Sequence, residues 1–321
     1  MKIEIITTKN NELKETGFGA LGACENVLKS INLLGHEVSL NVCTEKSDLD
    51  EVIQKEAGLV ILAVKYLSQK GRNGIWPSEY LGKMGLNYSG SCREVLKFDS
   101  DKSLAKNQLR NQNIKTANFF SAIPGDCTCE DDLPLDFPLF LKPIDAANGN
   151  GIDDLSLVKN FQEYESKIKS LFAIYKQPIL IEEYLDGREF TVSIIEVENS
   201  KLFVAAVEII PNKSLNGLRI LGHVAKTDNL EVIKKISDTE LTKKVKNIAI
   251  KSFFNLGARD FGRIDIKANQ KEECFFMEAN LVPGMTKNTS YFPRAFEVEY
   301  GTSYDEVIKL IIQQGLNRIS L

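Results

Sequence analysis

The chain has 321 residues, of which 43% are hydrophobic and 26% are charged, a composition typical of a globular protein with more than one domain. Its 40 Lys and Arg and 44 Asp and Glu residues give a net charge of −4 and form no strongly basic run, which argues against nucleic acid as a partner. No apolar stretch reaches the roughly 18 residues of a membrane-spanning helix, so we expect small-molecule partners and no membrane.

The first residues and the cysteines both indicate a cytoplasmic protein. Residues 1–6 place a charge inside a short apolar run, which predicts a first β-strand and not a signal peptide. The six cysteines are scattered along the chain and show no paired metal spacing. We therefore expect reduced thiols, as in the cytosol.

The first hundred residues alternate strand and helix patterns. Strands are expected at residues 3–7, 37–42 and 58–64, and helices at 20–34 and 49–56. The continuous apolar run at 58–64 is typical of a strand covered on both faces, as in a parallel α/β sheet. A βαβαβ unit is therefore predicted, in a first domain over residues 1–98, and a Gly-, Asn- and Ser-rich stretch follows the unit at 71–91.

Helices and strands continue beyond residue 98 without an internal repeat. We expect strands at 138–143, 179–183, 190–197, 263–267 and 274–279 and helices at 101–112, 241–256 and 304–314. Prolines and acidic residues predict a surface loop at 123–137. The fold class is α/β, with an α+β second part.

The last two of these strands carry a set of oxygen donors. Side chains alternate along a strand, so Glu278 and Asn280 share one face, and Asp265 joins them from the partner strand of the hairpin. Such donors suit Mg²⁺ when phosphate oxygens complete its shell. Arg263 shares the face of Asp265 and offers a fixed cation to a carboxylate or oxyanion. The alternative is an exposed polar hairpin face.

Two further segments suit a nucleotide. Lys142 lies on an otherwise apolar strand and precedes the small-residue loop 145–151, whose backbone N–H groups can face phosphates, although no G-K-[ST] follows as in a Walker A loop. The acidic segment 182–189 connects two apolar strands and can offer backbone groups to an adenine edge and a carboxylate to ribose. For Lys142 and its loop, the alternative is a strand and turn with a snorkelling lysine. For the segment 182–189, the alternative is a charged hairpin loop.

These three segments, in this order and spacing, resemble the ATP-grasp fold and, within it, the D-alanine–D-alanine ligase group. The likeness extends to residues 71–91, to Asp101-Lys102 and to residues 280–286, and covers about residues 58–321. It implies an N-terminal pre-ATP-grasp domain at 1–98, a small central lid subdomain at 99–180 with the phosphate loop, and a C-terminal α+β subdomain at 181–321 with the metal and substrate site.

The resemblance also implies roles residue by residue. The ATP-binding residues would be Lys102, Lys142, Asn148, Gly149, Gly151, Glu182, Glu183, Tyr184, Leu185 and Glu189. Asp265, Glu278 and Asn280 would bind two Mg²⁺ ions, which Mn²⁺ can replace. Arg263 and the Gly284 N–H would stabilise an oxyanion, and Lys226 would come from a loop that closes on the γ-phosphate.

The chemistry implied is an ADP-forming ligation in two steps. A carboxylate substrate attacks the γ-phosphorus to give an acylphosphate, and the amine of a second substrate then expels phosphate. Such chemistry needs positioning and charge stabilisation more than a protein nucleophile, which suits a chain with two histidines. The resemblance further implies a homodimer formed through the N-terminal domain.

Departures from the group's pattern concern the substrates. The loop after the first strand, residues 9–22, lacks the group's serine and glutamate, and Glu15 is one candidate to replace them. Thr289 and Ser290 align near the serine that holds the acceptor carboxylate. Three hypotheses therefore stay open: a peptide- or amide-forming ligase for amino acids or similar acids other than two D-alanines, a divergent D-alanine–D-alanine ligase of cell-wall synthesis, and a nucleotide-binding pseudoenzyme.

Overall fold

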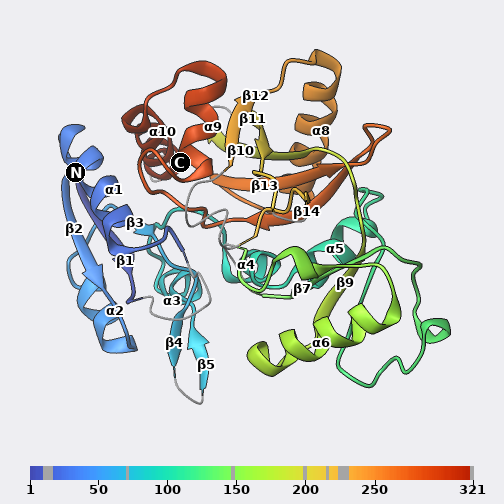
Figure 1. Cartoon of the computed structure of the whole chain (residues 1–321). Coiled ribbons are helices and arrows are strands. Elements are labelled where there is room, and N and C mark those ends of the chain that lie inside the picture. The colour runs from blue at the N-terminus through green and yellow to red at the C-terminus, as the bar shows by residue number, and fades with distance from the viewer. Residues whose placement is uncertain are drawn as a thin grey trace.

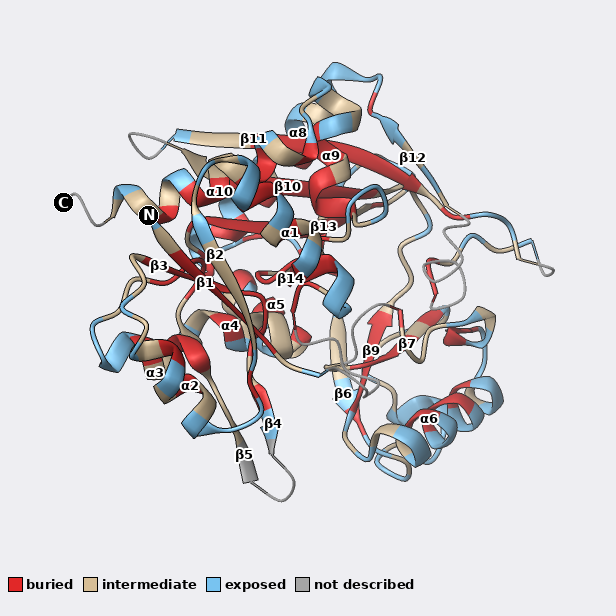
Figure 2. Ribbon diagram, turned by 90° about the vertical axis from the view of Figure 1, so that its left-hand side faces the viewer, coloured by how far each residue is buried: buried red, intermediate tan, exposed pale blue. Residues whose placement is uncertain are grey.

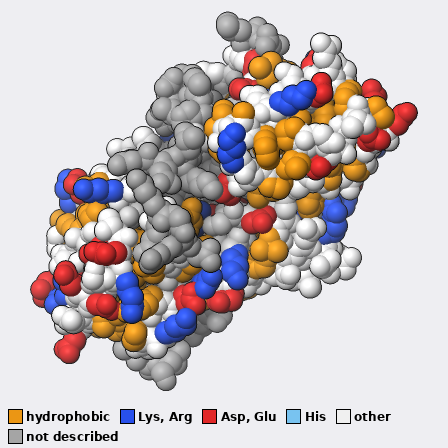
Figure 3. Space-filling view, turned by 90° about the horizontal axis from the view of Figure 1, so that it is seen from below, with side chains coloured by type: hydrophobic (Ala, Val, Ile, Leu, Met, Phe, Trp, Pro, Cys, Tyr) orange, Lys and Arg blue, Asp and Glu red, His pale blue; other side chains and the backbone are white. Residues whose placement is uncertain are grey.

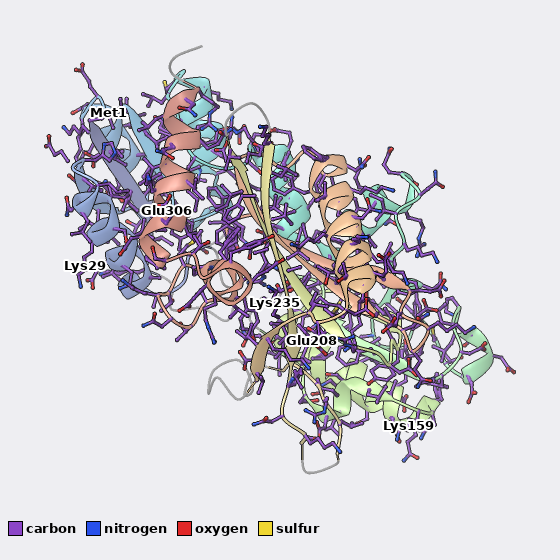
Figure 4. All side chains as sticks on the ribbon, turned by 90° about the horizontal axis from the view of Figure 1, so that it is seen from above. Met1, Lys29, Lys159, Glu208, Lys235 and Glu306 are labelled. Atoms are coloured by element: carbon purple, nitrogen blue, oxygen red, sulfur yellow. The ribbon has the colours of Figure 1, made fainter. Side chains whose placement is uncertain are left out.

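The structure is a computed structural model that describes residues 1–9, 17–69, 72–145, 149–197, 201–214, 217–222 and 231–318. One of the four sheets in these ranges is the two-stranded hairpin of β4 (Leu67–Gln69) and β5 (Arg72–Ile75). The other three form the main bodies of the fold, which Figure 1 shows in blue, in green and in yellow to orange. Figure 4 gives their order from above, with Met1 and Lys29 at one end of the molecule, Lys159 toward the other, and Glu208 and Lys235 between them. No helix in the described ranges is long and apolar enough to cross a membrane.

The N-terminal body confirms the predicted βαβαβ unit. It comprises β1 (Lys2–Thr7), α1 (Leu21–Leu33), β2 (Glu37–Val42), α2 (Lys46–Ile53) and β3 (Leu59–Leu62). The strands pair in parallel in the order β2-β1-β3. β3 is buried on both faces, as its continuous apolar run predicts.

The Gly- and Asn-rich stretch that follows is more ordered than its composition indicates. It forms the hairpin β4 (Leu67–Gln69) and β5 (Arg72–Ile75), then α3 (Pro77–Lys83) and α4 (Arg93–Ser100). Pro77 stands at the first position of α3, where its fixed φ and missing N–H are tolerated. This segment connects the first body to the remainder of the chain.

The central body is a four-stranded antiparallel sheet of order β6-β9-β7-β8, covered by α6. Its elements are β6 (Phe119–Ala122), η1 (Glu130–Asp132), β7 (Leu139–Pro143), η2 (Asp154–Ser156), β8 (Leu157–Val158), α6 (Phe161–Tyr175) and β9 (Ile179–Glu183). Tyr164, Ile168 and Leu171 on α6 pack on Leu139 and Ile181 of the sheet. Figure 2 shows this red, buried stripe on an otherwise exposed helix.

The C-terminal body is a five-stranded antiparallel sheet of order β12-β11-β10-β13-β14. Its strands are β10 (Glu189–Val197), β11 (Lys201–Ile210), β12 (Val232–Lys235), β13 (Phe261–Ala268) and β14 (Cys274–Asn280). The helices are α8 (Thr239–Asn255), α9 (Tyr291–Tyr300) and α10 (Tyr304–Asn317), and all three pack on the sheet. The predicted strands and helices of this part are confirmed within a few residues.

Helix α5 (Lys102–Arg110) joins the central and C-terminal bodies, because it precedes β6 in the chain but packs against β14. A bridge between Thr116 and Phe276 adds a backbone connection at the same place. Helix α5 and the residues that follow it therefore contact both bodies. The domain boundaries predicted from the sequence stay predictions.

The C-terminal helix returns to the first sheet, so that one hydrophobic core is common to the N- and C-terminal bodies. A Cβ at Gly315 of α10 would lie 2.8 Å from a methyl carbon of Leu59, so only glycine permits this approach of α10 to β3. Ion pairs strengthen the same interface. Asp260, which is 1% exposed, binds the Arg318 guanidinium and accepts a 2.6 Å hydrogen bond from the Gly90 N–H.

We expect Asp260→Ala to destabilise the protein strongly, because it leaves the Arg318 cation and the Gly90 N–H without their partner at a buried interface. Removing one partner of a buried ion pair costs about 3–5 kcal/mol, which corresponds to a fall of at least about 5 °C in the thermal midpoint. Differential scanning calorimetry measures this shift. Lys83→Ala, which breaks the exposed pair with Glu79, should change the midpoint by less than about 2 °C; equal shifts would contradict the role of Asp260.

Candidate active site

The predicted oxygen donors meet on the face of β13 and β14 that turns away from α8. Gly262 lies against Phe253 of α8, so the alternating residues Arg263 and Asp265 point to the opposite face. The strand register pairs Asp265 with Glu278 and Arg263 with Asn280. The register shifts directly after Asp265, and this bulge accommodates one extra residue in β14.

Asp265 is held from several sides. The Arg263 guanidinium donates to both of its carboxylate oxygens at 3.0 Å, and the Asn280 amide donates to it at 3.3 Å. Thr191 of β10 donates a further hydrogen bond. Asp265 and Arg263 are both nearly buried, so their charges act in a medium of low polarity.

The donor set fits a hard divalent cation. Within the described ranges no group of three or more His, Cys, Asp and Glu side chains could hold a metal, so Asp265 and Glu278 would need the Asn280 amide oxygen and ligand oxygens to complete a shell. Two carboxylates plus one amide leave several positions open, as Mg²⁺ bound together with phosphate requires. The residues present thus suit the predicted ion.

Lys102 brings a cation to the same carboxylates. It stands at the first position of α5, whose N-terminus is capped by Asp101 through the Leu104 N–H at 2.9 Å. The Lys102 ammonium lies 3.3 Å from a Glu278 carboxylate oxygen. The sequence-predicted phosphate lysine and metal ligand are therefore neighbours in space, although 176 positions separate them in the chain.

The second predicted lysine, Lys142 on β7, belongs to a buried cluster of three charges. Its ammonium lies 2.6 Å from one Glu182 oxygen, and the ammonium of Lys106 on α5 lies 2.6 Å from the other. Burial would raise the pKa of Glu182, but the two lysines outweigh burial and hold the pKa at about 2. Burial lowers the pKa of Lys106, and the Glu182 carboxylate opposes that shift.

A pocket opens over this cluster, between the central and C-terminal sheets. Its lining includes Lys142, the segment Glu182 to Leu185, and Glu189, together with Asp265 and Glu278. The Glu183 carboxylate accepts hydrogen bonds from the backbone and side chain of Asn118 at 2.9 and 3.0 Å, so its side chain fixes the linker. Tyr184 stacks on Phe140 with ring centroids 6.4 Å apart.

Glu189 lies at the other end of the pocket, where Lys267 of β13 approaches it to 3.2 Å. Arg219 also lines the pocket and donates to the Pro211 carbonyl at 2.5 Å. Gly222 closes the same side, since a Cβ there would lie 2.4 Å from the Ile152 carbonyl oxygen. This segment therefore contacts the end of the predicted phosphate loop.

The phosphate loop is described in part. Gly149 and Gly151 adopt φ values of 73° and 77°, in the left-handed region that favours glycine. Asn148 lies outside the described residues, as do Lys226 and Glu15. For these three the predicted roles stay predictions.

The segment around Gly284 is held by residues from the N-terminal body and from α4. Asp99 pairs with Lys65 at 2.6 Å and accepts hydrogen bonds from the backbone N–H groups of Leu281 and Val282. The Met285 N–H donates to the Phe18 carbonyl at 2.9 Å. All three bodies of the fold thus position the site.

Gly284 also lies beside the predicted acceptor residues. A Cβ at Gly284 would stand 2.9 Å from the Ser290 hydroxyl oxygen, which accepts a hydrogen bond from the Thr286 N–H at 2.9 Å. Thr289 is exposed next to it. The contact of Thr289 and Ser290 with a substrate stays a prediction.

Sequence reasoning missed two features of this site. Lys106 was not predicted, although its i,i+4 spacing from Lys102 on one polar helix is a usable signal. Tyr291 covers Arg263, with the guanidinium carbon 5.6 Å from the ring centroid, and donates a 2.5 Å hydrogen bond to Glu231. Nothing in the local sequence connects Glu231 to Tyr291, because 60 residues separate them.

Figure 3 shows the molecule from below, with side chains of both charges mixed among hydrophobic ones on that face. This distribution agrees with the absence of a basic run in the sequence. Many of the charges described above lie instead in the lining of the pocket.

The chain is similar to several known proteins. Residues 112–313 match the family model described as D-ala D-ala ligase C-terminus. The D-alanine–D-alanine ligase B of Clostridium perfringens is 27% identical over 320 residues, covering 99% of both chains. The D-alanine–D-alanine ligase of Aquifex aeolicus is 27% identical over 294 residues, covering 89% of this chain and 92% of its own.

Solved structures agree in fold. The D-alanine–D-alanine ligase of Bacillus anthracis in complex with ATP superposes with a TM-score of 0.77 at 22% identity, covering 100% of this chain and 99% of its own. The VanG D-Ala:D-Ser ligase of Enterococcus faecalis gives a TM-score of 0.72 at 18% identity, covering 98% and 99%. These matches confirm the predicted ATP-grasp fold. The chain therefore belongs to the D-alanine–D-alanine ligase family and is an ATP-dependent ligase that joins a carboxylate to an amine.

Proposed function

We propose that the protein ligates two small amino acids, or similar acids, with ATP and Mg²⁺, through an acylphosphate. The observation that carries this proposal is the convergence of Lys102, Lys142, Asp265 and Glu278 around one pocket, with Arg263 beside them. Cations for phosphates and carboxylates for a metal are thereby placed next to a guanidinium suited to an oxyanion.

The nucleotide would occupy the pocket between the two sheets. The backbone of Glu183 and Leu185 would face the adenine edge, with Tyr184 beside it, and Glu189 would accept from the ribose hydroxyls. Lys102 and Lys142, with N–H groups around Gly149 and Gly151, would bind the phosphates. Asn148 and Lys226 would complete the phosphate site from the two loops.

Asp265, Glu278 and Asn280 would hold the metal, as two Mg²⁺ ions or Mn²⁺ in their place. The metal supplies charge neutralisation on the phosphate oxygens. Arg263 now binds both oxygens of the Asp265 carboxylate. When Arg263 binds a substrate oxygen instead, Asp265 can turn toward the metal.

The chain's own residues then account for the two steps. The pocket aligns the first substrate's carboxylate with the γ-phosphorus, and the carboxylate oxygen displaces ADP. When the amine attacks the acylphosphate carbonyl, negative charge develops on its oxygen, and Arg263 with the Gly284 N–H would stabilise it. Collapse of that centre expels phosphate and leaves the amide.

Two substrate choices remain under this chemistry. The unmatched loop at 9–22 favours amino acids other than two D-alanines, with Glu15, Thr289 and Ser290 as candidate substrate contacts. The names of the relatives favour D-alanine in both positions. We further propose a homodimer through the N-terminal domain and domains at 1–98, 99–180 and 181–321.

Phosphate release from ATP and Mg²⁺ with single and paired D- and L-amino acids tests the function. We expect release that depends on a defined pair, because the acylphosphate needs one acid to form it and one amine to consume it. Release with D-alanine alone would select the cell-wall ligase. No release with any member of the panel, while ATP still binds, would favour a nucleotide-binding pseudoenzyme.

Asp265→Asn and Glu278→Gln should each lower kcat by at least about a thousandfold, because each removes an anionic ligand of the metal that neutralises the transferring phosphate. Thermal midpoints near that of the wild-type protein would show that the fold is retained. Steady-state phosphate release measures the effect. Activity near the wild-type rate in either variant would exclude that residue as a metal ligand.

Arg263→Ala should lower kcat about a hundredfold, since one oxyanion donor contributes roughly 3 kcal/mol. KM for the amine substrate should rise more than KM for ATP, because Arg263 lies on the acceptor side of Asp265. Initial rates with each substrate varied in turn separate the two effects. An unchanged kcat would remove Arg263 from the reacting centre.

A further inference from the structure

Lys106 is the most buried charged side chain of the pocket and has no role in the function proposed so far. Its side chain is 1% exposed. Its ammonium lies 2.6 Å from Glu182, 3.2 Å from the Thr116 hydroxyl and 3.3 Å from the Phe276 carbonyl. Two hydrogen bonds and one ion pair thus hold Lys106 within the protein.

Lys142 differs from Lys106 in this respect. Its single ion-pair partner in the described part of the chain is Glu182, at 2.6 Å, and its side chain is 3% exposed. Lys142 lines the same pocket as the predicted metal carboxylates. It can therefore exchange its partner for a ligand phosphate by a small movement, while Lys106 cannot.

The count of charges gives the cluster its chemical character. Lys106 and Lys142 carry two positive charges and share the single negative charge of Glu182, while Glu278 and Glu189 attract Lys142 as well. Because Glu182 is shared between two lysines, Lys142 can take a polyphosphate as a further anionic partner. Without Lys106, Glu182 and Lys142 would form a neutral closed pair, and a phosphate would have to compete with Glu182 for Lys142.

We propose that Lys106 is a positioning residue, which neutralises Glu182 and thereby releases Lys142 to bind the phosphates of the nucleotide. The proposal rests on the proposed function, because it presumes that Lys142 faces ATP. Lys106 itself would not touch the nucleotide; its effect is transmitted through Glu182. The interaction also ties α5 to β9 and β14, so the same lysine fixes the floor of the pocket.

Calorimetric titration of the full-length protein with ATP and with adenosine separates this role from a general loss of structure. In Lys106→Met, Glu182 keeps Lys142, so affinity for ATP should fall at least about tenfold more than affinity for adenosine, which has no phosphate. Lys106→Arg keeps the charge and should retain most of the wild-type ratio of the two affinities. Lys106→Gln replaces Lys106→Met if the latter does not fold.

Lys246→Met is the matched control. Lys246 on α8 pairs with Glu299 at 2.5 Å, away from the residues that line the pocket. Loss of this ion pair should leave the ratio of the ATP and adenosine affinities unchanged. Comparable changes in the two variants would overturn the assignment.

The pH dependence supplies a second readout, which a purely structural lysine would not move. In the wild-type protein the pKa of Glu182 is about 2, so the carboxylate stays ionised from pH 5 to 8. In Lys106→Met one cation is gone, and burial raises the pKa of Glu182. Lowering the pH should protonate Glu182 and free Lys142, so ATP affinity relative to the wild-type protein should recover as the pH falls.

The double variant Lys106→Met/Glu182→Gln should likewise regain phosphate-dependent affinity relative to Lys106→Met, because Lys142 then has no competing carboxylate. An ATP to adenosine ratio in Lys106→Met equal to that of the wild-type protein would overturn the inference. Failure of the wild-type protein to bind ATP would instead contradict the proposed function, so the two failures are distinguishable.

Discussion

The site depends on charge compensation, because its charged groups lie between two sheets that shield them from water. Glu182 ends the central sheet and lies between Lys142 of the same sheet and Lys106 of α5. Asp265 and Glu278 in the C-terminal sheet are matched by Arg263 and Lys102. Each carboxylate thus has a neighbouring cation, and the pocket can be shielded from water without leaving a buried anion alone.

The same principle connects the bodies of the fold. Asp99, which pairs with Lys65, holds the backbone at Leu281 and Val282, and Asp260, which pairs with Arg318 at the end of α10, holds the backbone at Gly90. Apolar contacts are not directional, so hydrophobic surface alone would let the bodies slide against one another. These polar contacts fix their relative position. The Gly284 N–H is consequently fixed relative to Arg263, although the two groups lie in different segments.

Alternation along strands made part of the site predictable. A period of two places Glu278 and Asn280 on one face, and Asp265 is paired with Glu278 in the sheet. The same reasoning could not find the pairing of Glu182 with Lys142, because register across β7 and β9 depends on tertiary packing. Strand β11 and helices α6 and α9 were also not predicted from the sequence. Their positions become clear only in the structure, from the surfaces that they cover.

The division of labour between the two halves of the site follows from this architecture. In the proposed nucleotide half the charges compensate one another, so a change at one residue disturbs several partners. On the proposed acceptor side, Tyr291 contacts both Arg263 and Glu231, and the Phe18 carbonyl accepts a hydrogen bond from the Met285 N–H. These contacts come from separate loops and one helix end, so under the proposed function substrate choice can vary there while the proposed ATP-binding charges stay in place.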